Sequence, residues 1–343
     1  MSKRVTIYDV ATKAGVGIGT VSRAMNNSPL IHEETKNRVL NVARELNYQP
    51  HAVAQSLARK RTNTIAVIVP FFTNYFFVEL LRVIQKLLAQ YDYDLILYSV
   101  DDIERGHIFL DRAIRERRVD GVLYISLPID GEYVERIQRS PLPIVLVDNY
   151  HQSLDSILIE NVEGAFTATN HLIELGHRRI AMINGSLRSL PAAERLEGYK
   201  KALNSHNIAF DEDLVIICDD SKDEDGFNEY AGYLAINKLF QRNDNFPTGV
   251  FISSDVQAIG AIRAIQEAGL KIPEDVAVVG FDDIQFAKFL GLTTIHQPIL
   301  EMGRLAVERL KACMNGKQVS LFQKKLKTNL VIRKTCGALS QGA

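Results

Sequence analysis

Short apolar runs alternate with amphipathic helical segments along most of this chain, and this alternation limits the fold more than any other feature. A first series predicts strands over 64–69, 94–99, 121–125 and 144–147, with helices over 77–90, 107–116 and 132–139. A second series begins near Arg179 with the strands "IAMING", "LVIIC", "GVFIS" and "VAVVGFDD", and with helices over 194–204, 229–242 and 257–268. Apolar strands followed by helices indicate parallel sheets covered on both faces. Two such series predict a two-lobed α/β body with a cleft between the lobes.

The first 62 residues differ from that body in charge. They carry ten Lys and Arg against four Asp and Glu, a balance of +6, whereas the rest of the chain carries 30 against 37, a balance of -7. One end of the chain is therefore suited to a polyanion, and the remainder is not.

Three short helices are predicted in the basic segment, over 7–14, 18–25 and 33–46, with Gly15 in the turn between the first two. Two short helices around a tight Gly turn form a helix-turn-helix, which places its second helix in the major groove of DNA. Apolar residues at helical spacing predict one small core. The residues of that core are Ile7, Val10, Ala11, Ala14, Val16, Val21, Ala24, Val39, Val42, Ala43 and Leu46.

The segments "VTIYDVATKAGVGIGTVSRAMN" and "ETKNRVLNVARELNYQPHAVAQSLARKRT" closely resemble the DNA-binding headpiece of the LacI/GalR family of bacterial repressors. Matching features continue to about residue 335. The resemblance implies a small all-α helix-turn-helix headpiece followed by a two-lobed α/β domain of the type I periplasmic-binding-protein-like fold. It also implies that "LTTIHQP", 292–298, returns the chain to the first lobe, ahead of a helix over 299–314.

The domain boundaries implied by the resemblance divide the chain into four parts. They are a headpiece over 1–49, a hinge helix and linker over 50–62, an effector-binding and dimerisation domain over 63–335, and a tail over 336–343. Within the third part, the N-subdomain is expected over 63–162 and 292–322, and the C-subdomain over 163–291 and 323–335.

The resemblance places Ile18 and Gly19 at the exposed start of the recognition helix, where the family chooses bases. Arg23 on the same helix can pair with both guanine acceptors, O6 and N7, or instead contact phosphate or solvent. Gly17 departs from the helix-capping Ser usual in the family, so this cap lacks a side-chain acceptor. The residues expected to contact DNA are Thr6, Tyr8, Gly17, Ile18, Gly19, Thr20, Ser22, Arg23, Asn26, His51, Ala54 and Leu57.

Residues 50–62, "PHAVAQSLARKRT", predict a short helix that begins at Pro50 and is marginal alone. In the family this is the hinge helix, which pairs with its twin and inserts a Leu into the minor groove; Leu57 is the matching residue. Ala54 is small enough for close helix pairing. A plain basic linker is the alternative interpretation.

Ligands of open parallel sheets lie beyond the carboxyl ends of the strands. Asp148 follows one such strand, and the resemblance assigns Arg195 and Asp255 to the effector site. An Arg and two carboxylates in one cleft can bind vicinal hydroxyls, although the two Asp residues could instead cap helices. The aromatics after the first strand are either pocket or packing residues. The expected effector-binding residues are Phe72, Phe76, Phe77, Asp148, Arg188, Arg195, Asp255 and Asp282.

The sequence contains no nucleophile elbow, phosphate-binding P-loop, zinc-protease or dinucleotide-binding motif, and "GVGIG" opens the recognition helix without following a strand. We therefore predict no enzymatic activity, no cofactor and no metal site. A sugar receptor that does not bind DNA is disfavoured by the basic segment and by a polar start without a signal-peptide core. No apolar run approaches a membrane span, so a cytoplasmic location without membrane contact is expected.

These features predict a sequence-specific transcriptional repressor of a catabolic operon that binds a pseudo-palindromic operator as a homodimer. Its expected effector is a small molecule, a sugar or glycoside. A purine-responsive regulator, or a catabolite regulator that depends on a phosphocarrier protein, is the alternative within the same family. The tail "CGALSQGA" predicts no tetramer.

Overall fold

The computed structural model describes residues 5–48, 61–72, 74–100, 105–116, 118–219, 225–242, 246–316 and 320–338. Its contacts divide the chain into two compact units, residues 1–63 and residues 64–343. Three of the expected DNA-contacting residues, His51, Ala54 and Leu57, lie with the predicted hinge helix outside the described residues.

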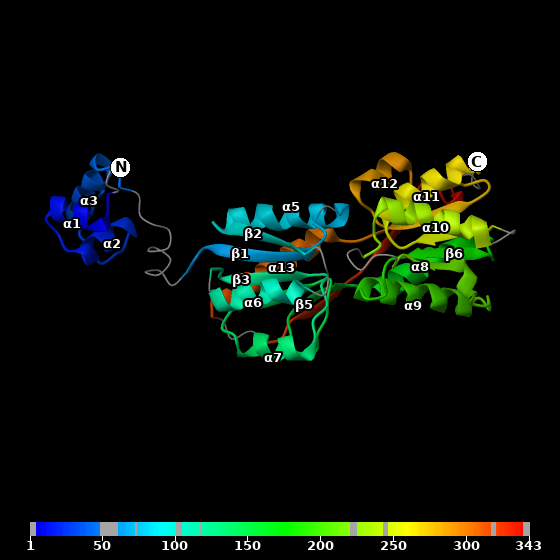
Figure 1. The fold of residues 1–343 in the computed structure, drawn as a ribbon, viewed down its shortest axis with the longest axis horizontal. Coiled ribbons are helices and arrows are strands. Elements are labelled where there is room, and N and C mark those ends of the chain that lie inside the picture. Colours follow the sequence, from blue (N-terminus) through cyan, green and yellow to red (C-terminus); the bar gives the residue numbers. More distant parts are fainter. Residues whose placement is uncertain are drawn as a thin grey trace. The chain divides into compact units, whose positions relative to one another are not determined.

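The first unit contains the three predicted helices, α1 (Ile7–Ala14), α2 (Ile18–Met25) and α3 (Glu33–Glu45) (Figure 1). Gly15 ends α1 with a φ of 66°, in the left-handed region that glycine adopts without steric cost. All eleven predicted core residues are either buried in one hydrophobic cluster or packed against it. The predicted headpiece core is therefore confirmed.

The first lobe of the second unit is built on a parallel sheet with the strand order β11-β5-β4-β3-β1-β2 (Figure 1). Helices α5 and α13 pack on one face of this sheet, and α6 and α7 pack on the other. The strands are β1 (Thr64–Pro70), β2 (Asp94–Val100), β3 (Gly121–Ile125), β4 (Ile144–Val147), β5 (Ser156–Ile159) and β11 (Gln323–Leu326). The helices are α5 (Tyr75–Gln90), α6 (Gly106–Glu116), α7 (Gly131–Arg139) and α13 (Ile299–Met314).

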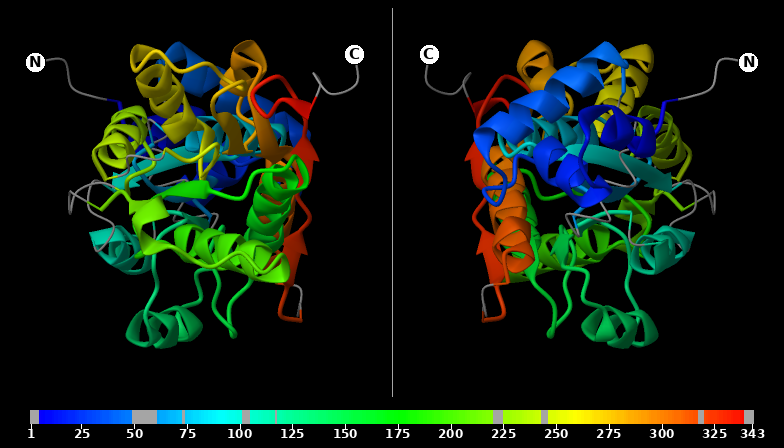
Figure 2. Two further views of the ribbon diagram at one scale, coloured as in Figure 1. Left: turned by 90° about the vertical axis from the view of Figure 1, so that its right-hand side faces the viewer. Right: turned by 90° about the vertical axis from the view of Figure 1, so that its left-hand side faces the viewer.

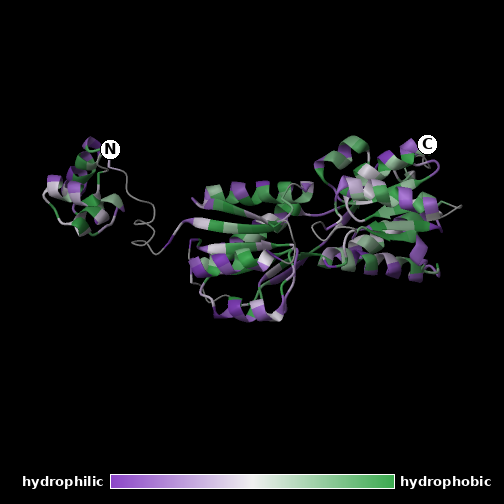
Figure 3. Cartoon of the chain, in the orientation of Figure 1, coloured by the Kyte–Doolittle hydropathy of each residue, from purple (hydrophilic) through white to green (hydrophobic). Residues whose placement is uncertain are grey.

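The second lobe has a sheet with the order β12-β10-β9-β8-β6-β7, in which only β12 runs antiparallel to its neighbour. Helices α8 and α9, green in Figure 2, cover one face, and α10, α11 and α12, yellow-green to orange, cover the other. The strands are β6 (Ile180–Asn184), β7 (Val215–Ile217), β8 (Gly249–Ile252), β9 (Ala277–Asp282), β10 (Thr293–His296) and β12 (Asn329–Val331). The helices are α8 (Asn161–Glu174), α9 (Leu190–Ser205), α10 (Glu229–Arg242), α11 (Asp255–Glu267) and α12 (Gln285–Leu290). Figure 3 shows that the strands of both sheets are predominantly hydrophobic.

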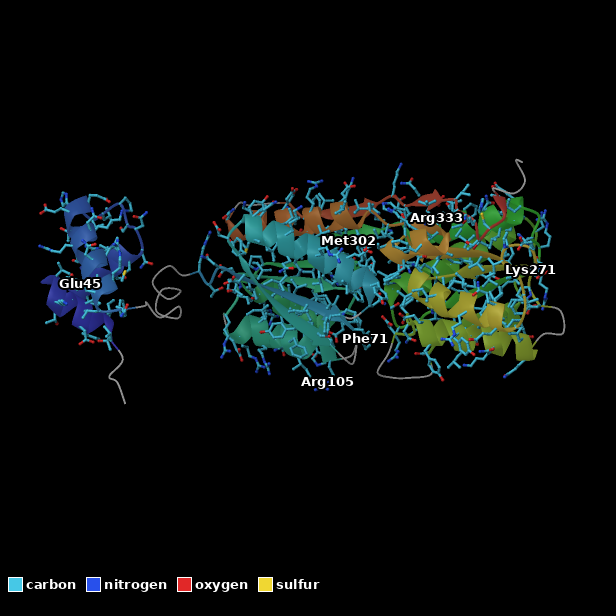
Figure 4. All side chains as sticks on the ribbon, turned by 90° about the horizontal axis from the view of Figure 1, so that it is seen from above. Glu45, Phe71, Arg105, Lys271, Met302 and Arg333 are labelled. Atoms are coloured by element: carbon cyan, nitrogen blue, oxygen red, sulfur yellow. The ribbon has the colours of Figure 1, made fainter. Side chains whose placement is uncertain are left out.

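Two segments lie in the opposite lobe from the one predicted. The segment 292–298 was expected in the first lobe, but β10 pairs with β9 and β12 in the second sheet. The chain returns to the first lobe only with α13, which carries Met302 (Figure 4). Residues 323–326 were expected in the second lobe, whereas β11 pairs with β5 in the first sheet. The chain therefore crosses between the sheets three times, after β5, β10 and β11.

Candidate functional site

Helix α2 presents one polar and open face to solvent. Ile18 is 41% exposed, and Gly19 and Arg23 are also exposed, whereas Val21 and Ala24 on the opposite face are buried in the headpiece core. Gly17 occupies the N-cap in an extended conformation, and its carbonyl accepts the amides of Thr20 and Val21 at 2.9 and 3.1 Å. A Cβ built on Gly17 or Gly19 would meet no atom within 4 Å. The packing of the headpiece itself therefore does not require glycine at either position.

Two of the expected DNA-contacting side chains also hold the headpiece helices in place. The amide and hydroxyl of Thr6 both donate to Asp9 Oδ2, at 2.8 and 2.7 Å, which fixes the start of α1. Asn26 follows α2 and donates from Nδ2 to the carbonyl of Ser22 at 2.9 Å. Tyr8 is exposed. These contacts lie within the headpiece, so contact of Thr6, Tyr8 and Asn26 with DNA stays a prediction.

A cavity of about 40 Å³ lies between the two lobes of the second unit. Most of its lining residues come from the carboxyl ends of strands or from the first turns of the helices that follow them. The first lobe contributes Pro70, Asn74, Phe76, Phe77, Ser126 and Asp148. The second lobe contributes Ser189, Pro191, Arg195, Asp225, Phe227, Ser254 and Asp282, and Gln297 follows β10.

Phe76 and Phe77 both line this cavity. Asn74 caps α5, with its Oδ1 accepting the Phe76 amide at 3.0 Å, and so fixes the start of the helix that carries both aromatic residues. Their ring centroids are 5.3 Å apart in an edge-to-face arrangement. Both side chains are also buried against the core of the first lobe, so each packs in the core and lines the cavity.

Arg195 projects from α9 and is only 4% exposed. Its Nε donates to Asn161 Oδ1 at 3.0 Å, and its Nη1 donates to the carbonyl of Ser253 at 2.5 Å. Nη1 also lies 3.7 Å from Asp282 Oδ1, and the guanidinium stands 3.9 Å from the ring centroid of Phe281. Burial lowers the pKa of Arg195, and the carboxylates around it oppose that shift. A cation fixed in this way is preorganised for a polar ligand.

Two buried carboxyl groups share the cavity with Arg195. Asp148 accepts a hydrogen bond from Ser126 Oγ at 2.7 Å, and burial raises the pKa of Asp148 to about 6. Asp282 accepts a hydrogen bond from Gln297 Nε2 at 2.5 Å, and burial raises the pKa of Asp282 as well. Among the described residues, Gln297 Oε1 is a buried acceptor without a hydrogen-bond partner. The cavity therefore combines one fixed cation with several acceptors that suit hydroxyl donors.

Asp255 does not face the cavity, contrary to the prediction. It is 1% exposed, its Oδ1 accepts from Thr294 Oγ1 at 2.6 Å, and its Oδ2 accepts from the amide of Ile284 at 3.0 Å. Asp255 therefore ties α11 to β10 and to the start of α12. Ser254 caps α11 by accepting the amide of Gln257, and it is Ser254 that lines the cavity.

Two other predicted effector residues lie away from the central cavity. Phe72 is 44% exposed and does not line it. Arg188 lines an adjoining cavity, where its Nη2 lies 3.2 Å from Asp219 Oδ1. The arrangement therefore brings together Phe76, Phe77, Asp148, Arg195 and Asp282 from the predicted set.

The central cavity also contains residues that the sequence did not predict. Ser126 and Ser254 each follow a buried strand closely, as Asp148 does, so their place in the sequence marks them as candidates. Asp225 and Phe227 lie in a segment without helical or strand periodicity, and Gln297 was expected in the other lobe. The missed residues are Asn74, Ser126, Ser189, Pro191, Asp225, Phe227, Ser254 and Gln297.

A helix-turn-helix unit on the same chain as a two-lobed body with a polar cavity defines a DNA-binding transcriptional regulator with a periplasmic-binding-protein-like effector domain, and not an enzyme. The sequence profile described as "Bacterial regulatory proteins, lacI family" matches residues 6–51, and that of a "Periplasmic binding protein-like domain" matches residues 169–336. The chain belongs to the LacI family of bacterial transcriptional regulators.

Relatives and solved structures match nearly the whole chain. Catabolite control protein A of Priestia megaterium is 33% identical over 320 residues, which span 92% of this chain and 94% of the relative. The ribose operon repressor of Haemophilus influenzae is 36% identical over 311 residues, 89% of this chain and 90% of the relative. The lac repressor dimer bound to operator and the anti-inducer ONPF superposes with a TM-score of 0.83 at 29% identity, over 97% of this chain and 99% of that one.

Across the described part of the chain, no helix has both the length and the apolar character needed to cross a membrane.

Proposed function

We propose that the protein represses a catabolic operon by binding a pseudo-palindromic operator as a homodimer, and that a neutral sugar or glycoside in the cavity between the lobes controls this binding. The observation that carries the proposal is Arg195 held beside Asp148 and Asp282 in a buried cavity with an unpartnered Gln297 acceptor. Vicinal hydroxyls both donate and accept hydrogen bonds, so a sugar can satisfy all of these groups at once.

The headpiece supports the DNA-binding part of the proposal. Open space around Gly17 and Gly19 lets the backbone at the start of α2 approach the floor of the major groove. The exposed Ile18 can contact a thymine methyl group, and the exposed Arg23 can reach a guanine. Since each chain has one headpiece, a dimer presents two recognition helices to two half-sites, about one helical turn apart. The related lac repressor is a dimer on its operator.

The charge balance of the cavity supports an uncharged ligand. Arg195 is the one cationic residue among the described residues that line the cavity, whereas Asp148, Asp225 and Asp282 are all acidic. An added phosphate group would lie close to several carboxylates in a poorly solvated space, where repulsion between like charges is strong. We therefore propose an unphosphorylated sugar instead of a sugar phosphate.

The first prediction tests the ligand class by thermal denaturation of the full-length protein. A neutral sugar present at 100 times its dissociation constant should stabilise the folded body by about 2.7 kcal/mol. We expect one or more neutral sugars to raise Tm and to change the affinity for operator DNA, whereas sugar phosphates and nucleobases should do neither. Stabilisation by a nucleobase alone would replace the sugar with a purine effector.

The second prediction concerns pH. Hydroxyl donors favour the ionised form of Asp148 and Asp282, so sugar binding should lower their raised pKa values and release protons. Arg195 remains charged throughout. Sugar affinity should therefore rise by up to about tenfold per pH unit for each coupled proton as the pH increases through about 6 to about 7, then level off. Calorimetry in two buffers of different ionisation enthalpy measures the proton release.

The free energy of unfolding of the regulatory body, measured without sugar, should fall as the pH rises, opposite to the change in sugar affinity. A carboxyl group whose pKa is higher in the folded state than in the unfolded state stabilises the fold below its unfolded pKa, and this contribution is lost as the pH rises through about 6. Asp148→Asn should reduce the pH dependence of sugar binding. Sugar affinity that is flat from pH 5 to 7.5 in the native protein would contradict the proposed contact with these carboxyl groups.

A further inference from the structure

We propose that the effector is a disaccharide, with one ring in the central cavity and the second ring between Tyr150 and Leu187. This inference rests on the proposed function, because it extends the same site. It adds a second binding region. Of the predicted effector residues, only Asp148 and Arg188 line this region.

A second cavity of about 350 Å³ adjoins the central one. The two cavities share four lining residues, Ser126 and Asp148 from the first lobe and Ser189 and Pro191 from the second. Asp148 therefore stands at the boundary between them. A ring that is hydrogen-bonded to Asp148 in the central cavity has a route for its linkage into the second cavity.

The walls of the second cavity present apolar side chains from both lobes. Tyr150, shortly after β4, is 46% exposed, and Leu187, shortly after β6, is 44% exposed. Both line the second cavity, together with Pro128 and Ile129. Single exposed apolar residues are common on protein surfaces, but here they flank one cavity that is continuous with a polar binding site. Such surfaces suit the C–H face of a sugar ring.

The loops that carry these walls are held by hydrogen bonds. Asn149 Oδ1 accepts the amide of Tyr150 at 2.7 Å, and Asn149 Nδ2 donates to the carbonyl of Leu127 in the loop after β3. On the other wall, Arg188 donates from Nε to Ser186 Oγ at 3.1 Å. Arg188 also places a guanidinium in the lining, where it suits hydroxyl acceptors of a second ring. Walls fixed before binding reduce the ordering cost of a larger ligand.

A third cavity, which shares Asn74, Asp225 and Phe227 with the central one, is less suited to an extended ligand. It is lined by the aromatics Phe71, Tyr75 and Phe227, but Asn74 Nδ2 donates to the carbonyl of Phe227 at 3.0 Å. Asn74 and Phe227 line both cavities, so this hydrogen bond joins the two lobes where those cavities meet. The ring of Tyr75 is packed against Phe286, with centroids 4.8 Å apart. The geometry therefore directs an extension toward Tyr150.

The test is calorimetric titration of the full-length protein with cellobiose, maltose and lactose, and with glucose and galactose as their constituent monosaccharides. We expect one disaccharide to bind at least about tenfold more tightly than its constituents. Tyr150→Ala and Leu187→Ala should each reduce the affinity for that disaccharide by about tenfold and leave monosaccharide affinity unchanged. Tyr133→Ala on α7 is the matched control, because Tyr133 contacts His107 outside both cavities.

Two results would overturn the two-ring inference. One is a monosaccharide that binds as tightly as every disaccharide, and the other is an equal loss of affinity for both kinds of sugar in the variants. If such a monosaccharide still controls operator binding, the proposed function stands and only the inference falls. If no sugar of either size binds, both fall together.

Discussion

Arg195→Ala is expected to abolish the effector response and also to destabilise the empty regulatory body. The substitution leaves the carboxyl group of Asp282 without its cation and removes the donor from Asn161 Oδ1. Removing one partner of a buried ion pair costs about 3–5 kcal/mol, because the other charge stays buried and uncompensated. Arg195 is only 4% exposed, and its Nε and Nη1 both donate hydrogen bonds, so the substitution affects the fold as well as the cavity.

Thermal denaturation with and without the effector sugar separates the two effects. Arg195→Lys keeps a positive charge but loses the planar set of five donors, so it should recover part of the stability and little of the sugar affinity. Arg263→Ala on α11 is the control, because Arg263 is exposed and pairs only within its own helix with Glu267 among the contacts described. An Arg195→Ala protein with native Tm and a native response to sugar would refute the assignment of this cavity.

Arg23→Ala is expected to reduce affinity for the operator selectively. A bidentate contact to guanine contributes about 1–3 kcal/mol of discrimination, so binding to the selected operator should weaken by roughly 5-fold to 150-fold. Binding to a scrambled duplex should change much less. A phosphate contact would instead weaken both duplexes alike and reduce the salt dependence of binding.

Fluorescence anisotropy at several salt concentrations distinguishes these outcomes, with an operator selected by the native protein from a random pool of duplexes. Arg44→Ala is the matched control, because Arg44 is an exposed arginine on α3 and not on the recognition helix. Equal losses on both duplexes would assign Arg23 to the phosphate backbone.

Local patterns in the sequence predicted most elements of the fold. The three headpiece helices, the strands β1 to β4 and the strands β6 to β9 follow from apolar periodicity and from Gly and Pro positions, whereas β5, β11 and β12 were not predicted. The lobe assignment of 292–298 and of 323–326 does not follow from such patterns. A buried strand such as "TTIH" can have the same residue pattern in either sheet. Only its contacts with distant strands decide which sheet it joins.

The candidate site was partly predictable for a similar reason. Asp148, Asp255 and Asp282 all lie at or just beyond buried strands, and the sequence does not distinguish their orientations. Asp255 is the first residue of α11, after the cap Ser254, so the turn of the helix directs its carboxylate back toward β10. Whether a polar residue at a strand end faces the cavity depends on where the following helix begins.

The three crossings between the sheets also constrain how the body is made. The last crossing separates β11 from β12, and these two strands complete the outer edges of the first and second sheets respectively. A nascent chain that ends before residue 320 lacks an edge strand of both lobes. Neither sheet can therefore be completed until residues 323–331 have been synthesised. The headpiece needs no later segment for its core, so it can fold while the rest of the chain is still being made.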